Sequence, residues 1–507
     1  MTPSRLAWML FTGYLLGACD GPVKAPDTQT PGDSLPDTAG GGDSTAHAGV
    51  DTGTPATDDT AHTGDSTPPA PACEGTLADV RSRKVCGDIA SQWVGQDLSP
   101  TKNADATVGI GSYEGYTNET NSIGVYSLDA LLESEPWVSS SASVGGISDD
   151  TSDFFGYALT TYADVDGDGQ ADLAVGAPGA CPPGEDNYAG RVFVYLGPMV
   201  GTRDWTTYDV VLDGYGLANQ FGAEVSPLPD IDGDGDDELL VGTYGNSSFA
   251  HMAQLFLGPI TSESRLDADA SYERGETSSG DNLEAADVDG DGISEILDVD
   301  EQLTIDTLGG VVFIIPSDLR GTVNLDDQMG IFGEVDRHIY GAVHSLAAGD
   351  ATGDGYNDLV FQLIDRRSGG HLMTAMVYAG PVTTSLGLDD ATAQVVVWEE
   401  LDAFTPRIAG DVDGDGQSGD VVAGMGQSGA VFLFPRPLSG SLTLTDADVI
   451  ARGEPYTDTL SDMFGFTLAA LPDLDADGAD ELLIGAPRND EGAADAGAVY
   501  LLYGASW

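Results

Sequence analysis

A short, acidic, glycine-containing stretch recurs along this chain at a regular interval. DVDGDGQAD begins at Asp164, and related stretches begin at Asp230, Asp287, Asp350, Asp411 and Asp473. The interval is about 60 residues, which is typical of architectures in which each repeat forms one supersecondary unit. Because a unit of this size cannot bury its apolar face alone, the chain is constrained to fold by packing successive units against one another.

The residues around each acidic stretch repeat as well. Several copies are followed by an apolar run that ends in Gly-Ala-Pro or a variant, and then by a second run such as RVFVYLGP or AVYLLYG. Runs rich in Val and Leu and bounded by glycine predict β-strands. An aromatic-glycine pair precedes most copies: Phe155-Gly156, Phe221-Gly222, Tyr340-Gly341 and Phe464-Gly465.

Residues 97–128 form a seventh, less acidic copy. DLSPTKNADATVGIGS matches DVDGDGQADLAVGAPG in length and in its second half, and NSIGVYSL supplies the following strand. Aligned in this way, the loop keeps two acidic residues, loses two others and gains a lysine: Asp97, Ser99, Thr101, Lys102 and Asp105. We therefore expect seven units, of which the first binds no cation.

The spacing of the acidic residues predicts a Ca²⁺ site in each of the other six loops. Carboxylates at positions 1, 3, 5 and 9 and the backbone carbonyl at position 7 can surround one Ca²⁺, while glycines at positions 4 and 6 permit the tight turn. The sixth loop has one extra residue, so Asp420 is predicted to act at position 9. The predicted sets are Asp164, Asp166, Asp168, Gln170 and Asp172; Asp230, Asp232, Asp234, Asp236 and Glu238; Asp287, Asp289, Asp291, Ile293 and Glu295; Asp350, Thr352, Asp354, Tyr356 and Asp358; Asp411, Asp413, Asp415, Gln417 and Asp420; Asp473, Asp475, Asp477, Ala479 and Glu481.

Two other interpretations of these loops are less consistent with the sequence. An EF-hand requires a glutamate at loop position 12 and flanking helices, whereas apolar strands follow directly here. Mg²⁺ is disfavoured because a flexible cage of carboxylates suits the larger ion. Solvated acidic turns explain a single copy but not six copies in the same register. We expect about six structural Ca²⁺ ions.

The aromatic-glycine pair, the DxDxDGxxD loop and the Gly-Ala-Pro strand together resemble the FG-GAP repeats of the integrin α-subunit β-propeller. The resemblance covers roughly residues 74–507. It implies an all-β fold: a seven-bladed propeller of four-stranded blades, with Ca²⁺ in the loop that joins the first two strands of a blade. Asp209 to Gly216 would be an outer strand, and Gly75 to Val85 would supply the strand that the last unit lacks. Closing the ring in this way protects strand edges.

Because successive strands of a blade run in opposite directions, a second set of loops should lie on the face opposite the acidic loops. These loops join strands two and three of each blade, and they vary in length and composition, as recognition loops do. The candidate ligand-contacting residues are Tyr188, Tyr244, Arg366, Arg367, His371 and Arg488. The arginines stand out because basic residues are scarce, although pairing with neighbouring carboxylates is the simpler role for them. We expect a protein or glycan ligand.

The N-terminal residues predict export. Residues 1–18 carry Arg5 and then an apolar stretch too short to span a bilayer, and Leu16-Gly17-Ala18-Cys19 resembles a bacterial lipobox. Cys19 is then the predicted lipidation site, which anchors a lipoprotein in the bacterial cell envelope in a leaflet that the sequence leaves open; an ordinary cleaved signal peptide is the alternative. Residues 19–72, rich in Thr, Asp, Pro and Gly, predict a disordered tether before a folded domain at 73–507.

Three further cysteines follow the tether. In an exported protein, Cys73 and Cys86 are close enough in sequence for a short-loop disulfide, which would leave Cys181 free in a loop. Other pairings stay open, because spacing alone does not fix connectivity. None of the three has the spacing of a metal ligand set.

Charge and residue usage narrow the function. With 84 acidic and 18 basic residues the net charge is −66, which disfavours nucleic acid as a partner. The six histidines are scattered, and neither a Ser-His-Asp arrangement nor HExxH occurs, so catalysis is the less favoured expectation. The sequence predicts a lipid-anchored, Ca²⁺-stabilised binding or adhesion module. A surface-tethered carbohydrate-active enzyme and a non-catalytic structural envelope protein are the alternatives.

Overall fold

The structure is a computed structural model of the whole chain. It describes residues 82–86, 94–99, 107–112, 121–127, 142–146, 153–183, 188–215, 219–243, 252–261, 267–273, 282–300, 310–334, 337–339, 346–365, 372–397, 404–426, 428–434, 436–453, 462–490 and 495–504. The predicted signal peptide, Cys19, the tether and Cys73 lie outside these residues.

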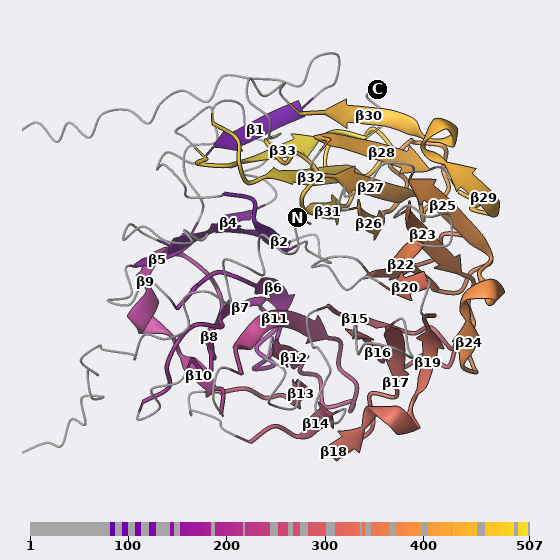
Figure 1. The fold of residues 1–507 in the computed structure, drawn as a ribbon. Helices are drawn as coiled ribbons and strands as arrows, with labels where there is room; N and C mark the ends of the chain where they lie inside the picture. Colours follow the sequence, from indigo (N-terminus) through magenta and orange to yellow (C-terminus); the bar gives the residue numbers. More distant parts are fainter. Residues whose placement is uncertain are drawn as a thin grey trace, which may run out of the picture.

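Seven β-sheets surround a central axis, with one strand of each sheet closest to that axis (Figure 1). Each sheet contains a four-stranded antiparallel blade, and the ring is the predicted seven-bladed all-β propeller. The helical elements among the described residues are short 3-10 turns, η1 (Trp205–Thr207), η2 (Leu325–Asp327), η3 (Leu388–Asp390) and η4 (Leu444–Asp446). No helix in this part of the chain has the length and hydropathy needed to cross a membrane.

The first four blades follow one another along the chain. From the axis outward, blade 1 contains β2 (Asp97–Ser99), β3 (Thr107–Ser112), β4 (Asn121–Ser127) and β5 (Ala142–Gly146). Blade 2 contains β6 (Leu159–Ala163), β7 (Asp172–Ala177), β8 (Arg191–Tyr195) and β10 (Val210–Asp213), the last of which is the predicted outer strand. Blade 3 contains β11 (Phe221–Leu228), β12 (Glu238–Thr243), β13 (Met252–Phe256) and β14 (Ala270–Glu273). Blade 4 contains β15 (Leu283–Ala286), β16 (Glu295–Asp300), β17 (Val311–Ile315) and β19 (Met329–Phe332).

The last three blades complete the ring. Blade 5 contains β21 (Leu346–Gly349), β22 (Asp358–Asp365), β23 (Leu372–Tyr378) and β25 (Ala393–Val397), and β20 (Arg337–Ile339) also pairs with β22. Blade 6 contains β26 (Phe404–Ile408), β27 (Val421–Met425), β28 (Ala430–Phe434) and β30 (Asp448–Arg452). Blade 7 contains β31 (Leu468–Leu471), β32 (Glu481–Ala486), β33 (Ala498–Leu502) and β1 (Ser82–Cys86).

The hydrophobic core lies between the blades. Among the described residues it forms seven clusters, one at each junction of neighbouring blades. Side chains alternate along a strand, so β32 places Leu482 and Ile484 in the cluster shared with blade 6 and Leu483 in the cluster shared with blade 1. The second strands are therefore rich in apolar residues, because both of their faces are buried.

The recurrent glycines lie where neighbouring blades touch. A Cβ added to Gly176 in blade 2 would lie 2.0 Å from the carbonyl oxygen of Gly222 in blade 3, and one added to Gly424 in blade 6 would lie 2.1 Å from that of Gly465 in blade 7. Gly222 and Gly465 also have φ values of 88° and 86°, which favour glycine. The aromatic-glycine pair and the Gly-Ala-Pro strand thus recur because they form the two sides of one backbone contact.

The ring closes where the first described strand joins the last blade. β1 pairs antiparallel with β33, with Ser82 opposite Leu502, and the Lys84 ammonium lies 4.9 Å from the centre of the Tyr500 ring. The segment after the tether therefore supplies the missing outer strand, as predicted, over Ser82–Cys86. A second closure joins blade 7 to blade 1, because the Thr467 hydroxyl donates to the Gly95 carbonyl at 2.8 Å.

Four additional strands, which we call clasp strands, tie a blade to the one before it. They are β9 (Gly201–Asp204), β18 (Gly321–Asn324), β24 (Leu386–Gly387) and β29 (Gly440–Thr443). Each comes from the link between the third and fourth strands of its own blade and pairs in parallel with the outer strand of the preceding blade. The clasp strands were not predicted, and they cover outer edges that would otherwise be unpaired.

Asp97 lies in β2 rather than at the start of an acidic loop, so the predicted alignment of the first unit is wrong at this point. It pairs with Gly111, and its carboxylate accepts hydrogen bonds from the Leu98 and Leu159 backbone N–H groups at 2.8 and 2.9 Å. Burial raises the pKa of Asp97 to about 6. The loop between the first two strands of blade 1 spans only residues 100–106. The predicted alignment matched the two stretches by length and so counted Asp97–Ser99, which belong to β2, as part of the loop.

Candidate metal centres

The six predicted acidic loops all join the first and second strands of a blade, in blades 2 to 7. In blade 3 the position 1 carboxylate, Asp230, accepts hydrogen bonds from the Gly233 and Gly235 N–H groups at 2.6 and 3.1 Å. These two glycines have φ values of 83° and 101°. The aspartate and the glycines therefore fold the loop around the first carboxylate, because few other residues adopt such φ values without strain.

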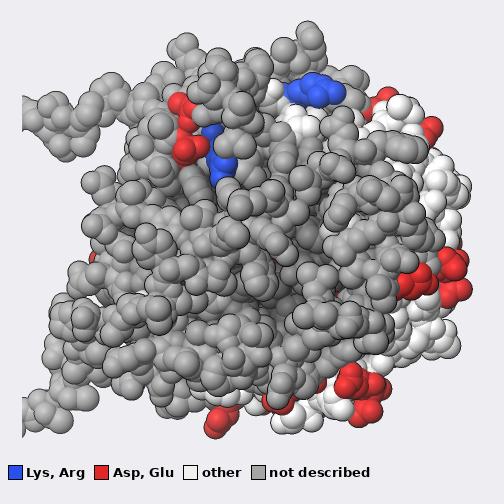
Figure 2. Space-filling view, in the orientation of Figure 1, with Lys and Arg blue, Asp and Glu red and all other residues white. Residues whose placement is uncertain are grey.

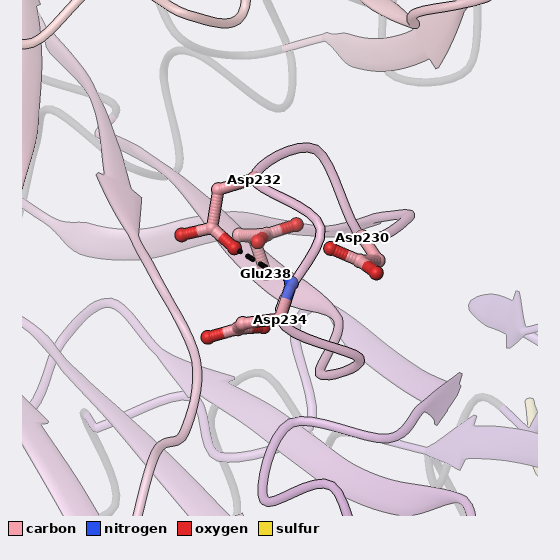
Figure 3. A group of neighbouring side chains, drawn as sticks. All are labelled: Asp230, Asp232, Asp234 and Glu238. Carbon is pink, nitrogen blue, oxygen red and sulfur yellow. Dashed lines mark hydrogen bonds between the residues drawn. The ribbon is translucent and has the colours of Figure 1, made fainter.

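The carboxylates at positions 3, 5 and 9 of the blade 3 loop accept hydrogen bonds from backbone N–H groups and lie close together (Figure 3). Asp234 N–H donates to Asp232 Oδ1 at 3.3 Å, and Asp236 N–H donates to Asp234 Oδ1 at 3.0 Å. Glu238 Oε2 accepts from the Ile231 N–H at 3.2 Å. The position 7 amide donates to the position 5 carboxylate in the other five loops as well, from Gln170, Ile293, Tyr356, Gln417 and Ala479.

Five groups of carboxylates among the described residues bring one oxygen from each member within 4.8 Å of the others: Asp230, Asp232, Asp234 and Glu238; Asp473, Asp475, Asp477 and Glu481; Asp164, Asp166 and Asp172; Asp287, Asp289 and Asp291; Asp411, Asp413 and Asp420. Three of the carboxylates that the sequence had assigned to positions 1, 3, 5 and 9 of these loops lie outside the groups, namely Asp168, Glu295 and Asp415. The fifth blade contributes no such group from Asp350, Asp354 and Asp358.

Three carboxylate oxygens in these groups are buried and have no hydrogen-bond partner: Asp164 Oδ1, Glu238 Oε1 and Glu481 Oε1. A buried acceptor without a donor is costly, and such atoms are rare in native structures. Hard divalent cations take their ligands from carboxylate oxygens of this kind. The residues present therefore fit a divalent cation.

Burial and mutual repulsion raise the pKa values of the position 9 carboxyls. Burial is the larger cause throughout, and it raises the pKa of Glu238 and Glu481 to about 8, those of Asp172 and Glu295 to about 7, and that of Asp420 to about 6. Neighbouring loop aspartates add to the increase, as Asp232 does for Glu238. In these five loops the protein itself therefore does little to stabilise the ionised form of the position 9 carboxyl.

The sixth loop accommodates its extra residue as the sequence suggested. Asp420 stands where the other loops have their position 9 carboxylate, and its Oδ2 accepts from the Val412 N–H at 3.0 Å. Gly419 takes a φ of 113°, which lets the chain bulge before β27. In the last loop, Ala476 stands at position 4 and has a φ of 61° where the other loops have glycine.

Position 8 links neighbouring loops, a role that sequence reasoning missed. Asp237 of blade 3 accepts from the Asp164 N–H of blade 2 at 3.0 Å, and Asp480 of blade 7 accepts from the Asp411 N–H of blade 6 at 2.8 Å. The Asn357 side-chain amide donates to the Asp287 carbonyl at 2.9 Å. The recurrence of Asp or Asn at position 8 in these three units was the available signal.

The structure describes only part of the predicted ligand face. Tyr244, Arg366, Arg367 and His371 lie outside the described residues. Tyr188 follows β7 on the side opposite the acidic loop, is partly exposed and has a φ of 49°. Arg488 holds an equivalent place after β32, and its backbone N–H donates to the Asp462 carbonyl at 3.1 Å.

Cys181 is disulfide-bonded, so the prediction that it is free is wrong. The prediction assigned Cys86 to Cys73, and that pairing lies outside the described residues. The spacing argument favoured a partner near in sequence, whereas folding can bring distant cysteines together.

Two of the seven units match a known repeat family. The FG-GAP repeat family matches residues 155–195 and 464–502, which are the second and last units. Integrin alpha-PS2 of Drosophila melanogaster is 37% identical over 124 residues, covering 22% of this chain and 9% of that protein. Integrin alpha-IIb of Mus musculus is 35% identical over 109 residues, covering 21% of this chain and 10% of that protein. The chain therefore matches about a tenth of the length of these relatives.

A solved structure of the Dos1 propeller aligns with 83% of this chain and 94% of its own, at a TM-score of 0.44 and 8% identity. The fold assignment does not depend on this alignment, since the seven sheets define the propeller directly. The similarity to integrin α chains and the acidic groups of the loops fit the binding of divalent cations.

Proposed function

We propose that this chain is an exported, lipid-anchored binding or adhesion module whose propeller is stabilised by Ca²⁺ and whose free face recognises a protein or glycan. The observation that carries the proposal is the division of the ring into two faces. The acidic loops keep one pattern of hydrogen bonds around the ring, whereas the loops between strands two and three range from residues 426–429 in blade 6 to residues 178–190 in blade 2. Recognition is usually carried by such variable loops on a rigid scaffold.

Ca²⁺ is the ion we propose for the acidic loops. It accepts six to eight oxygen ligands in a flexible geometry, which suits loops that differ in the number of converging carboxylates. The buried unpartnered oxygens of Glu238 and Glu481 are the ligands that most need such an ion. Chelation with EGTA is expected to lower the melting temperature of the propeller, and an unchanged melting temperature would contradict a stabilising role.

Attachment through Cys19 to a bacterial envelope follows from Leu16-Gly17-Ala18-Cys19 and from the composition of residues 19–72. A flexible tether of this length has a root-mean-square reach on the order of 40 Å, enough to hold the propeller clear of the bilayer. Mass spectrometry of the mature N-terminus in a bacterial host should find a diacylglyceryl cysteine. A Cys19→Ala variant should be released into the soluble fraction, and retention of that variant in membranes would contradict lipid anchoring.

Binding is best tested with residues 73–507, the expected extent of the folded domain, on arrays of glycans and envelope proteins. The array is read in millimolar Ca²⁺ and again with EGTA, and the spots are checked for products by mass spectrometry. Ca²⁺-dependent retention without product supports the binding module. Product formation would favour a carbohydrate-active enzyme, and a complete lack of binding would favour a structural envelope protein.

A further inference from the structure

Three departures from the repeat meet at one place in the structure. The fifth loop has Thr352 at position 3 where the other loops have aspartate, and the sixth loop has the extra glycine Gly419. Blade 6 also has Arg436 before a proline where blades 2, 3 and 5 have glycine at the corresponding Gly-Pro. A Cβ added to Gly419 would lie 1.9 Å from the Asp350 carbonyl oxygen and 3.0 Å from Arg436 Nη1, so all of these positions adjoin the fifth loop.

The Arg436 guanidinium lies against the fifth loop, although Arg436 belongs to blade 6. Its Nη2 is 3.5 Å from Asp350 Oδ2, the carboxylate at loop position 1. The same Nη2 would lie 2.8 Å from a Cβ placed on Gly353, at loop position 4. The Arg436 side chain is largely buried, with 14% of its surface exposed. A buried cation of the protein itself therefore stands against the carboxylate that begins the metal set in the other loops.

The neighbouring departures explain how an arginine fits there. At the equivalent glycines a Cβ would collide with the acidic loop of the same blade. It would lie 2.6 Å from the Ala171 carbonyl oxygen at Gly197 and 2.4 Å from the Asn357 carbonyl oxygen at Gly380. In blade 6 the loop is lengthened at Gly419, whose φ of 113° carries the chain away from this contact. The extra glycine thus makes room for a side chain that the other blades exclude.

The charge of the fifth loop is also unlike that of the others. Asp350, Asp354 and Asp358 do not form a converging group, whereas four carboxylates converge in blades 3 and 7. With Thr352 neutral and Arg436 positive, the loop offers less negative charge to an ion, and the number of ligand charges sets Ca²⁺ affinity. A guanidinium fixed beside Asp350 would also repel a divalent cation at that position.

We propose that Arg436 takes the place of a metal ion in the fifth loop. The propeller then binds Ca²⁺ in the loops of blades 2, 3, 4, 6 and 7, while an internal ion pair between blades 5 and 6 holds the loop of blade 5. This inference rests on the proposed Ca²⁺ binding of the other loops. It replaces the expectation of about six ions with a count of five. Residues 350–358 should therefore keep their conformation when Ca²⁺ is removed.

Native mass spectrometry of residues 73–507 with excess Ca²⁺ is expected to show five bound ions. Hydrogen exchange is expected to show that chelation lowers protection in residues 164–172, 230–238, 287–295, 411–420 and 473–481 but leaves residues 350–358 unchanged. Six ions, or a loss of protection at 350–358 equal to that of the other loops, would overturn the proposal. Both measurements use residues 73–507 without a substitution, so they do not depend on the folding of a substituted variant.

A pair of variants tests the role of the guanidinium. Thr352→Asp combined with Arg436→Met restores the fourth carboxylate and removes the positive charge, and it is expected to raise the count to six and make residues 350–358 Ca²⁺-dependent. Arg452→Met, at an exposed arginine of β30, is the matched control and is expected to leave the count at five. A double variant that folds and still binds five ions would contradict the proposal. If the unmodified protein binds no Ca²⁺ at all, the proposed Ca²⁺ binding fails, and this inference fails with it.

Discussion

Ca²⁺ binding by this propeller should release protons, and the number can be worked out from the position 9 carboxyls. In the ion-free protein the pKa is about 8 for Glu238 and Glu481, about 7 for Asp172 and Glu295, and about 6 for Asp420. At pH 7 the first pair is about nine-tenths protonated, the second pair about half and Asp420 about one-tenth. The five carboxyls then carry about three protons, which must leave when the oxygens bind a cation.

The same carboxyls set the pH dependence of the ion-free fold. Their folded pKa values lie above those of the unfolded chain, so the folded state binds more protons and ionisation weakens it. The ion-free protein is therefore expected to lose stability as the pH rises from about 4.5 through about 8. The Ca²⁺-loaded protein should show little change over this window, because its position 9 groups are already ionised and compensated by the bound ion.

Isothermal titration calorimetry measures the release directly. Titrating Ca²⁺ at pH 7 in two buffers of different ionisation enthalpy gives the number of protons released, expected to be about three, and repeating the titration at pH 9 should reduce it to about 0.2. A Glu238→Gln variant provides a control, since it should lower the release at pH 7 by about one proton. A release below one proton at pH 7, or one that is unchanged at pH 9, would refute the assignment of these carboxyls as ligands.

Three further predictions concern stability, measured by urea denaturation in saturating Ca²⁺. Ala476→Gly should stabilise the protein by about 0.5–1 kcal/mol, because glycine adopts the left-handed backbone at this position without strain. Gly233→Ala should destabilise the protein by about 1 kcal/mol for the same reason. Changes in stability of the same sign for the two variants would contradict the argument. Gly424→Ala should cost about 2–3 kcal/mol because its Cβ would meet the next blade, and a neutral result would show that the blades can move apart. Asp480→Ala should cost about 1–3 kcal/mol by leaving the Asp411 and Asp473 N–H groups without an acceptor, while the exposed Asp448→Ala should change stability by less than about 0.5 kcal/mol.

The sequence predicted the fold well because the repeat records contacts between units. Each unit needs the same glycine contact, such as that of Gly176 with Gly222, and the same loop turn, such as that around Asp230. Both depend on backbone conformations that few residues allow, so the pattern survives in the sequence. Outer-strand closure by the segment after the tether was also predictable, because the last unit visibly lacked a strand.

The features that were not predictable depend on side chains that act outside their own unit. Arg436 is part of blade 6 in the sequence, but its side chain contacts Asp350 of the fifth loop. The spacing of residues within the fifth loop does not indicate this contact. Val94-Gly95 fills the place of an aromatic-glycine pair without an aromatic residue. The clasp strands carry few apolar residues, since they pair at an exposed edge, and periodicity therefore does not reveal them. Among the described residues, Figure 2 shows acidic side chains in separate groups, most of them at the right and lower edges of this view, and the net charge alone does not give these positions.

The pairing of β1 with β33 has a consequence for how the protein is made. Nearly the whole propeller lies between these two strands in the sequence, so among the described strand pairings the one that closes the ring joins the residues farthest apart in the chain. Such contacts form late, because the intervening chain must first be ordered. β1 is synthesised before the rest of the propeller and cannot pair until residues 498–502 are also available. A chain that ends before residues 498–502 therefore leaves β1 without its partner, and unpaired strand edges of this kind favour aggregation.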